Sequence, residues 1–94
     1  MAKLTEQEIA AGLEKLPGWS REGNAIRRGY TFSTFAEGIR FVDRVATEAD
    51  RADHHPDIDV RWTMVTMTLS THSAGGLTRK DLALAAAIDA AARG

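Results

Sequence analysis

Three copies of the pattern Thr-x-x-Glu/Asp mark where helices can begin in this chain. They are Thr5-x-x-Glu8, Thr34-x-x-Glu37 and Thr78-x-x-Asp81. In each copy the threonine hydroxyl and the acid three residues later can satisfy two backbone N–H groups that the start of a helix leaves unpaired, which is the arrangement called a capping box. The sequence therefore predicts three helices that begin at these threonines.

The ends and faces of these helices follow from proline, glycine and apolar spacing. The first helix is expected to run to about Leu16, because Pro17-Gly18 stops it. The second is expected to end at or before His55, since the residue before Pro56 disfavours the α region, so its last turn holds Asp50 to His54. Its predicted core-facing stripe consists of Phe35, Ile39, Val42, Ala46 and Ala49. The third helix is alanine-rich, and its thin side chains suit close contact with the core or with another subunit.

Between the predicted helices, the apolar period changes from 3.6 to 2, which is typical of strands. Residues 19–21 and 25–32 are expected to form a hairpin around Gly23-Asn24. Two further strands are indicated by alternation at Ile58, Val60 and Trp62, and from Val65 to His72. The order helix, strand, strand, helix, strand, strand, helix predicts an α+β fold, in which three helices cover one face of a four-stranded antiparallel sheet. The other face, rich in threonine and serine, is left to water or to a second subunit.

Composition limits the classes of function that this chain can serve. Its 94 residues suit a single domain, 1–94, and 12 Lys+Arg against 13 Asp+Glu provide no basic surface for nucleic acid or an anionic membrane. There is no cysteine, which excludes disulfides, thiolate nucleophiles and cysteine-ligated metals. Neither a signal-type apolar segment nor a transmembrane stretch is recognisable, so we expect a cytoplasmic protein.

The segment Asp50-Arg-Ala-Asp-His54-His55-Pro56 is the first candidate for chemistry. Asp50 and His54 are four residues apart, so on a helix the carboxylate could accept from one ring nitrogen and set the tautomer of the other. The helix C-terminus also favours an imidazolium. The alternative interpretation is a histidine that only contacts the helix dipole.

Three other residues have both a structural and a functional interpretation. His72 is expected at a strand end before Gly75-Gly76, and is either an exposed histidine or a partner of His54 at one rim of the sheet. Asp81 is needed as a capping residue whether or not it has a catalytic role. Trp62 is a strand tryptophan of a kind that more often packs in a core than binds a ligand.

Metal binding and nucleophilic catalysis are weaker alternatives. His54, His55, His72 and a carboxylate are suitable zinc ligands, but neighbouring histidines point in different directions and no H-x-x-x-H pair occurs. We therefore expect no metal. Ser70 and Ser73 lie near His72 without a nucleophile elbow, and Gly75-Gly76 lacks the pattern of a phosphate loop.

Read in order, an acid, His54-His55-Pro56, Trp62, His72 and Asp81 resemble the signature of the pterin-4a-carbinolamine dehydratase family, also called the dimerization cofactor family. The segments Leu16-Pro-Gly-Trp19, Thr68-Leu-Ser-Thr-His72 and Gly76-Leu-Thr strengthen the resemblance, which spans nearly the whole chain. Asp50 is a departure, because Glu is frequent there in the family.

The resemblance implies a hydro-lyase that dehydrates 4a-hydroxytetrahydropterin to quinonoid dihydropterin and water, and so recycles the pterin cofactor of aromatic amino-acid hydroxylases. It implies no cofactor, assembly into a homodimer or homotetramer through strand edges and helices, and a pterin-dependent hydroxylase as a possible partner. Carried over by residue, His54 and His72 are expected to do acid/base work and His55 to hold the pterin. Asp50, Asp81 and Trp62 are expected to orient these groups or to bind substrate.

Two other functions stay open at this level. Some members of the family stabilise transcription-factor dimers, so a protein-binding regulatory module is the main alternative. A histidine-ligated metal hydrolase is the other, and the sequence alone does not assign the acid and the base between the histidines.

Overall fold

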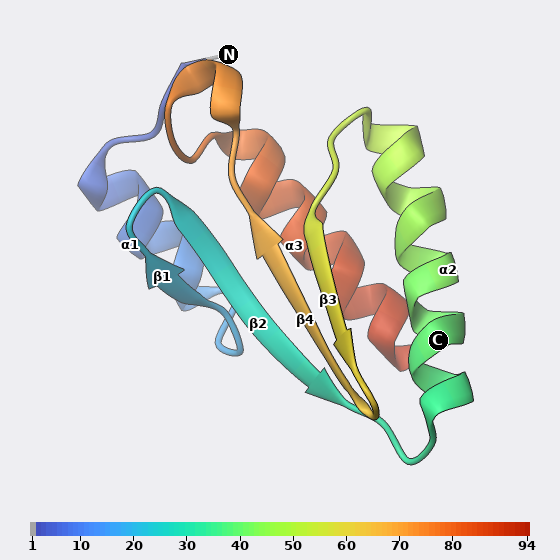
Figure 1. The fold of residues 1–94 in the computed structure, drawn as a ribbon. Helices are drawn as coiled ribbons and strands as arrows, with labels where there is room; N and C mark the ends of the chain where they lie inside the picture. The colour runs from blue at the N-terminus through green and yellow to red at the C-terminus, as the bar shows by residue number, and fades with distance from the viewer. Residues whose placement is uncertain (1) are drawn as a thin grey trace.

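The computed structural model describes residues 2–94 as three helices and four strands. Their order is α1 (Glu6–Glu14), β1 (Ser20–Glu22), β2 (Ala25–Thr31), α2 (Phe35–Ala52), β3 (Asp57–Arg61), β4 (Met64–Leu69) and α3 (Arg79–Arg93), with a 3-10 helix, η1 (His72–Ala74), before α3. The strands form one antiparallel sheet in the spatial order β1-β2-β4-β3, with the helices on one of its faces (Figure 1). This is the α+β fold predicted from the sequence.

The three helices begin where their capping threonines predict. Thr5 and Thr78 form complete capping boxes with Glu8 and Asp81. At Thr34 the side chain accepts from the backbone N–H of Glu37. Each start therefore satisfies backbone donors that a bare helix end would leave unpaired.

The core-facing side of α2 differs from the predicted stripe. Its buried residues are Gly38, Phe41, Val45 and Ala49, whereas Phe35, Ile39 and Ala46 are exposed. The aromatic ring of Phe41 packs between Tyr30 and Phe32, with centroid distances of 4.8 and 5.1 Å. A Cβ at Gly38 would lie 3.3 Å from Val65 Cγ2, so glycine allows this face to approach the sheet closely. The predicted stripe is confirmed at the buried Ala49 and the half-buried Val42. It was wrong at the three exposed positions, because it extended the spacing from Phe35, the first residue of α2.

The inner face of the sheet supplies most of the apolar core. Ile26 and Tyr30 of β2 and Val65, Met67 and Leu69 of β4 are buried against the helices. The opposite face carries the alternate residues, including the half-buried Thr66 and Thr68. This agrees with the alternation in the sequence.

The turn between β3 and β4 departs from the predicted strands. β3 ends at Arg61, and Trp62 with Thr63 forms a two-residue connection to Met64. Trp62 is 78% exposed and has a φ of 52°, a left-handed conformation that is uncommon for a bulky residue. The predictions that Trp62 continues the strand and packs in the core were both wrong.

A carboxylate of α3 ties this helix to the sheet. Asp89 Oδ1 accepts from Trp19 Nε1 at 3.0 Å, from Arg28 Nη1 at 2.9 Å and from the Tyr30 hydroxyl. Burial, followed by the hydrogen bond to Asp89, raises the pKa of Tyr30 above its ordinary value. Asp89 lies on α3, eight residues beyond Asp81. Its contacts with Arg28 and Tyr30 hold the C-terminal half of the helix against β2. Within residues 2–94, no helix is long and apolar enough to cross a membrane.

Candidate active site

The connection between α2 and β3 carries the two adjacent histidines. Asp53 ends α2 in a left-handed conformation with a φ of 52°, and the backbone N–H of His54 bonds back to Ala49 at 3.1 Å. A left-handed residue is a common way to end a helix, and aspartate tolerates it better than most side chains. His54 therefore lies outside the helix, so the prediction that the last turn extends to His54 was wrong.

This change of helix end also changes the partner of each histidine. Asp50 Oδ1 lies 2.9 Å from His55 Nε2, and both side chains are largely exposed, at 80% and 59%. His54 Nε2 instead lies 2.5 Å from Asp81 Oδ1 on α3, and these side chains are 11% and 0% exposed. The predicted contact between Asp50 and His54 was therefore wrong, because the helical spacing on which it rested does not reach His54.

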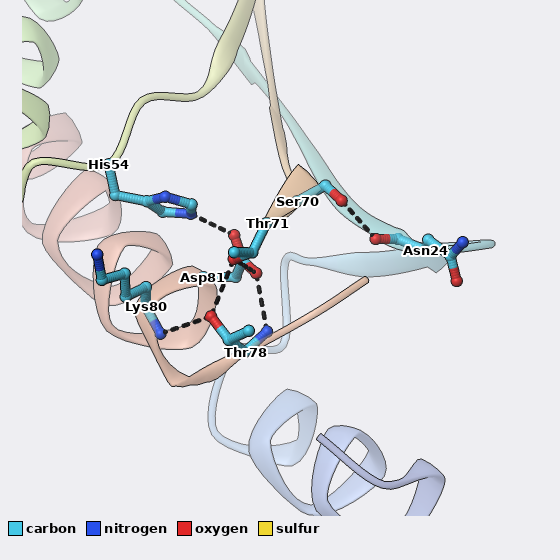
Figure 2. A network of polar contacts seen from close by, with 7 residues as sticks. All are labelled: Asn24, His54, Ser70, Thr71, Thr78, Lys80 and Asp81. Carbon is cyan, nitrogen blue, oxygen red and sulfur yellow. Dashed lines mark hydrogen bonds and ion pairs between the residues drawn. The ribbon is translucent and has the colours of Figure 1, made fainter. Parts of the chain in front are cut away.

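Asp81 combines the two roles that the sequence left as alternatives. Its Oδ2 accepts from the backbone N–H of Thr78 at 2.9 Å, which completes the cap of α3, and from the Thr71 hydroxyl at 2.8 Å. Its Oδ1 is the oxygen that contacts His54 (Figure 2). The first turn of α3 favours a negative charge at this position through the helix dipole. The site thus holds a buried carboxylate against one ring nitrogen of a histidine.

The 3-10 helix η1, which begins at His72, follows β4 at the end of the sheet where the connection from α2 enters β3 (Figure 1). His72 begins η1 instead of ending the strand, because β4 already ends at Leu69, and its side chain is exposed. A cavity of about 300 Å³ is lined by Asn24, Ala25, Asp57, Thr68, Ser70, His72 and Gly75. His54 is not among these lining residues, so a pocket shared by His54 and His72 stays a prediction.

Thr71 joins the two halves of the site and was not singled out from the sequence. It is buried, it directly precedes His72, and its hydroxyl contacts the carboxylate that contacts His54. The sequence pattern could have indicated it, because Thr71 follows Met67 and Leu69 at the same two-residue spacing and so falls on the inward-facing side. A polar side chain at an inward position needs a buried partner.

Trp62 does not lie beside the histidines within one chain. It follows the far end of β3, whereas His55 precedes the near end of this strand. Five residues of strand span about 16 Å. A contribution of Trp62 to substrate binding stays a prediction, and it would require a second copy of the chain. The described residues also contain no group of three or more His, Cys, Asp or Glu side chains that could hold a metal ion.

Comparisons with known proteins identify the family to which this chain is similar. The sequence model of the family described as pterin 4 alpha carbinolamine dehydratase matches residues 2–91. A protein from Mycobacteroides abscessus, provisionally named pterin-4-alpha-carbinolamine dehydratase, is 58% identical over 89 residues, which cover 95% of each chain. One from Nocardia farcinica with the same provisional name is 54% identical over 90 residues, which cover 96% of this chain and 95% of that one.

Two solved structures extend the comparison to three dimensions. The crystal structure of a transcriptional coactivator/pterin dehydratase from Brucella melitensis matches with a TM-score of 0.92 and 35% identity, over 96% of this chain and 98% of that one. A pterin dehydratase-like protein, identified as a RuBisCO assembly factor in the alpha-carboxysome, matches with a TM-score of 0.65 and 25% identity, over 79% and 86%. The fold and the relatives define a dehydratase class, and the chain belongs to the pterin 4 alpha carbinolamine dehydratase family.

Proposed function

We propose that this protein removes water from 4a-hydroxytetrahydropterin and releases quinonoid dihydropterin. In this elimination the bond from C4a to the hydroxyl breaks, N5 loses its proton, and a double bond forms between C4a and N5. The departing hydroxyl takes up a proton and leaves as water. Atoms and charge balance without an oxidant, a reductant or a metal, so groups that accept and donate protons near neutral pH are sufficient.

The buried contact between His54 and Asp81 is the observation that carries this proposal. A carboxylate held against one ring nitrogen leaves the other nitrogen to exchange protons, and it stabilises the imidazolium that forms when the ring is protonated. His72 is the second proton-transferring group in the proposal, and it lies two residues beyond Ser70 in the loop that also contains Thr71.

The remaining site residues have binding and orienting roles in this proposal. His55, which is exposed beside His54, holds the pterin, and Asp50 orients His55 through their 2.9 Å contact. Trp62 adds to substrate binding in an oligomer, because it lies too far along β3 to do so within its own chain. In this proposal, release of quinonoid dihydropterin recycles the pterin cofactor of an aromatic amino-acid hydroxylase.

The direct test is an assay with freshly generated 4a-hydroxytetrahydrobiopterin. Formation of the quinonoid product is followed by absorbance and corrected for the spontaneous dehydration in the same buffer. We expect turnover above this background, and we expect it to be lost when His54 or His72 is replaced by alanine. Glu14→Ala, at the exposed end of α1, is the control and should keep wild-type turnover. Wild-type protein that does not exceed the spontaneous rate would contradict the proposal.

A second candidate function is that of a protein-binding module. It is favoured by the two structural relatives, one a transcriptional coactivator/pterin dehydratase and the other a RuBisCO assembly factor. It is also favoured by the exposed apolar side chains of Phe35 and Ile39, one helical turn apart on α2. The double variant Phe35→Ser/Ile39→Ser separates the two functions. If it dehydrates the pterin normally but loses self-association by light scattering, this face serves assembly and not catalysis.

A further inference from the structure

Thr71 places a hydroxyl in the interior beside Asp81, although the helix cap does not need it. The cap of α3 is complete with Thr78 and Asp81 alone. Thr71 Oγ1 lies 2.8 Å from Asp81 Oδ2 and 2.9 Å from Thr78 Oγ1, and all three residues are buried (Figure 2). A buried hydroxyl with two partners of this kind restricts both the geometry and the direction of the hydrogen bonds around it.

The protons of this network have one consistent order when Asp81 is ionised. A carboxylate then only accepts, so Thr71 must give its single hydroxyl proton to Oδ2. The oxygen of Thr71 remains free to accept, and it receives the hydroxyl proton of Thr78. The oxygen of Thr78 accepts in turn from the backbone N–H of Lys80 at 3.3 Å. The hydroxyls are therefore aligned from the start of α3 towards Asp81.

This order determines which atoms of Asp81 and His54 meet. Oδ2 is occupied by the Thr71 hydroxyl and by the Thr78 backbone N–H, which leaves Oδ1 for the histidine. Two acceptors cannot share a contact of 2.5 Å, so His54 Nε2 carries a proton and donates it to Oδ1. Nδ1 is then the ring nitrogen left to exchange a proton with a substrate.

We propose that Thr71 is a positioning residue, which fixes the Asp81 carboxylate and thereby holds His54 as the Nε2–H tautomer with Nδ1 as its working nitrogen. Without the Thr71 hydroxyl, Oδ2 keeps only one donor and the carboxylate can turn. His54 then loses its fixed partner and also populates the Nδ1–H tautomer, which cannot accept a proton at Nδ1. The effect on rate rests on the proposed dehydration, whereas the tautomer can be measured without any substrate.

The experiment uses Thr71→Val, which keeps the side-chain shape and removes the hydroxyl, together with Thr71→Ser, which keeps the hydroxyl. Thr47→Val is the matched control, because the exposed Thr47 hydroxyl bonds to the Asp43 carbonyl within α2, outside this network. Nitrogen-15 NMR of histidine-labelled protein reports the tautomer of His54, identified by the signal that is missing in His54→Ala. The pterin assay reports kcat and KM for the same set.

We expect a single Nε2–H tautomer in the wild type, in Thr71→Ser and in Thr47→Val, and a mixture of tautomers in Thr71→Val. The kcat of Thr71→Val should fall about tenfold with KM nearly unchanged, which is less than the roughly 10²–10⁴-fold cost of losing an acid/base group. Thr71→Ser should restore both readouts. If circular dichroism shows that Thr71→Val is unfolded, Thr71→Ala takes its place with the same expectations.

Thr71 is not a positioning residue if the variant without the hydroxyl keeps the single Nε2–H tautomer of the wild type. A wild-type protein with no dehydratase turnover would instead contradict the proposed function, and the NMR comparison would still decide the role of Thr71. A fall in kcat with an unchanged tautomer would also overturn the proposal, because the loss would then not pass through His54.

Discussion

The two carboxylate–histidine pairs allow one substitution, Asp→Asn, to be made in a buried and in an exposed setting. In Asp81→Asn the amide oxygen can still accept from Thr71 and from the Thr78 backbone N–H, so the cap of α3 survives. The amide NH₂ then faces His54 Nε2, where the carboxylate oxygen stood. Since a donor now meets that nitrogen, Nε2 must accept, and the ring proton moves to Nδ1.

The structure predicts a small loss of stability and a large loss of rate for Asp81→Asn. Three charge-assisted hydrogen bonds become neutral ones, and each change costs about 0.5–1 kcal/mol, which gives about 1.5–3 kcal/mol in the free energy of unfolding. The histidine is held in the wrong tautomer, so turnover should fall by about 10²–10⁴-fold. The loss of rate thus exceeds what the loss of folded protein can explain.

Asp50→Asn is the control on the exposed pair. The contact with His55 is exposed and is worth about 0–1 kcal/mol. The equilibrium constant of unfolding and kcat should therefore each change by no more than about fivefold. Urea denaturation gives the free energy of unfolding, and the pterin assay gives kcat for both variants. Equal losses of rate in the two variants, or wild-type turnover in Asp81→Asn, would refute this reasoning.

Three further predictions concern catalysis, pH and assembly. His54→Ala and His72→Ala should each lower turnover by about 10²–10⁴-fold, and the double variant should lose clearly less than the product if both act on one transition state; a fully multiplicative loss would argue for separate steps. Because burial and then Asp89 raise the pKa of Tyr30, the native state keeps a phenol proton that the unfolded chain releases near pH 10. Stability is therefore full below that pH and falls above it by up to about 1.4 kcal/mol per pH unit, and denaturation of Tyr30→Phe should lack this slope. Light scattering should show at least a dimer, since β1 and β3 are open edges, and a mass of 10.2 kDa at micromolar protein would contradict this.

The features that could be predicted from the sequence are those set by neighbouring residues. The caps at Thr5 and Thr78 need only an acid three residues later, and the hairpin needs only Gly23, whose φ of 58° suits a tight turn. These signals place the helices and strands in order, and this order with its alternating apolar residues was enough to predict the sheet. The type and the order of these helices and strands are set by neighbouring residues, so tertiary packing did not override them.

The features that could not be predicted depend on contacts between distant parts of the chain. Two apolar stripes of α2 have nearly the same spacing, and only the position of the sheet selects the one with Gly38 and Phe41. A glycine adds nothing to an apolar pattern, yet here it sets the distance between helix and sheet. Trp62 lies two residues after Val60 and so continues the alternation of β3 into the turn, and periodicity therefore could not show that β3 ends at Arg61.

The partner of His54 shows how a local rule can be outweighed by a distant contact. Helical spacing pointed to Asp50, four residues away, but the left-handed Asp53 ends the helix before His54 and removes the geometry on which this spacing depends. Asp81, 27 residues away, has a further advantage, because a capping carboxylate needs only one of its two oxygens for the backbone. The second oxygen of a buried cap must find another donor, since a buried charge with an unfilled acceptor is costly. A capping acid that the fold buries beside a strand end is therefore a place where a paired histidine is to be expected, even when the sequence offers a nearer carboxylate.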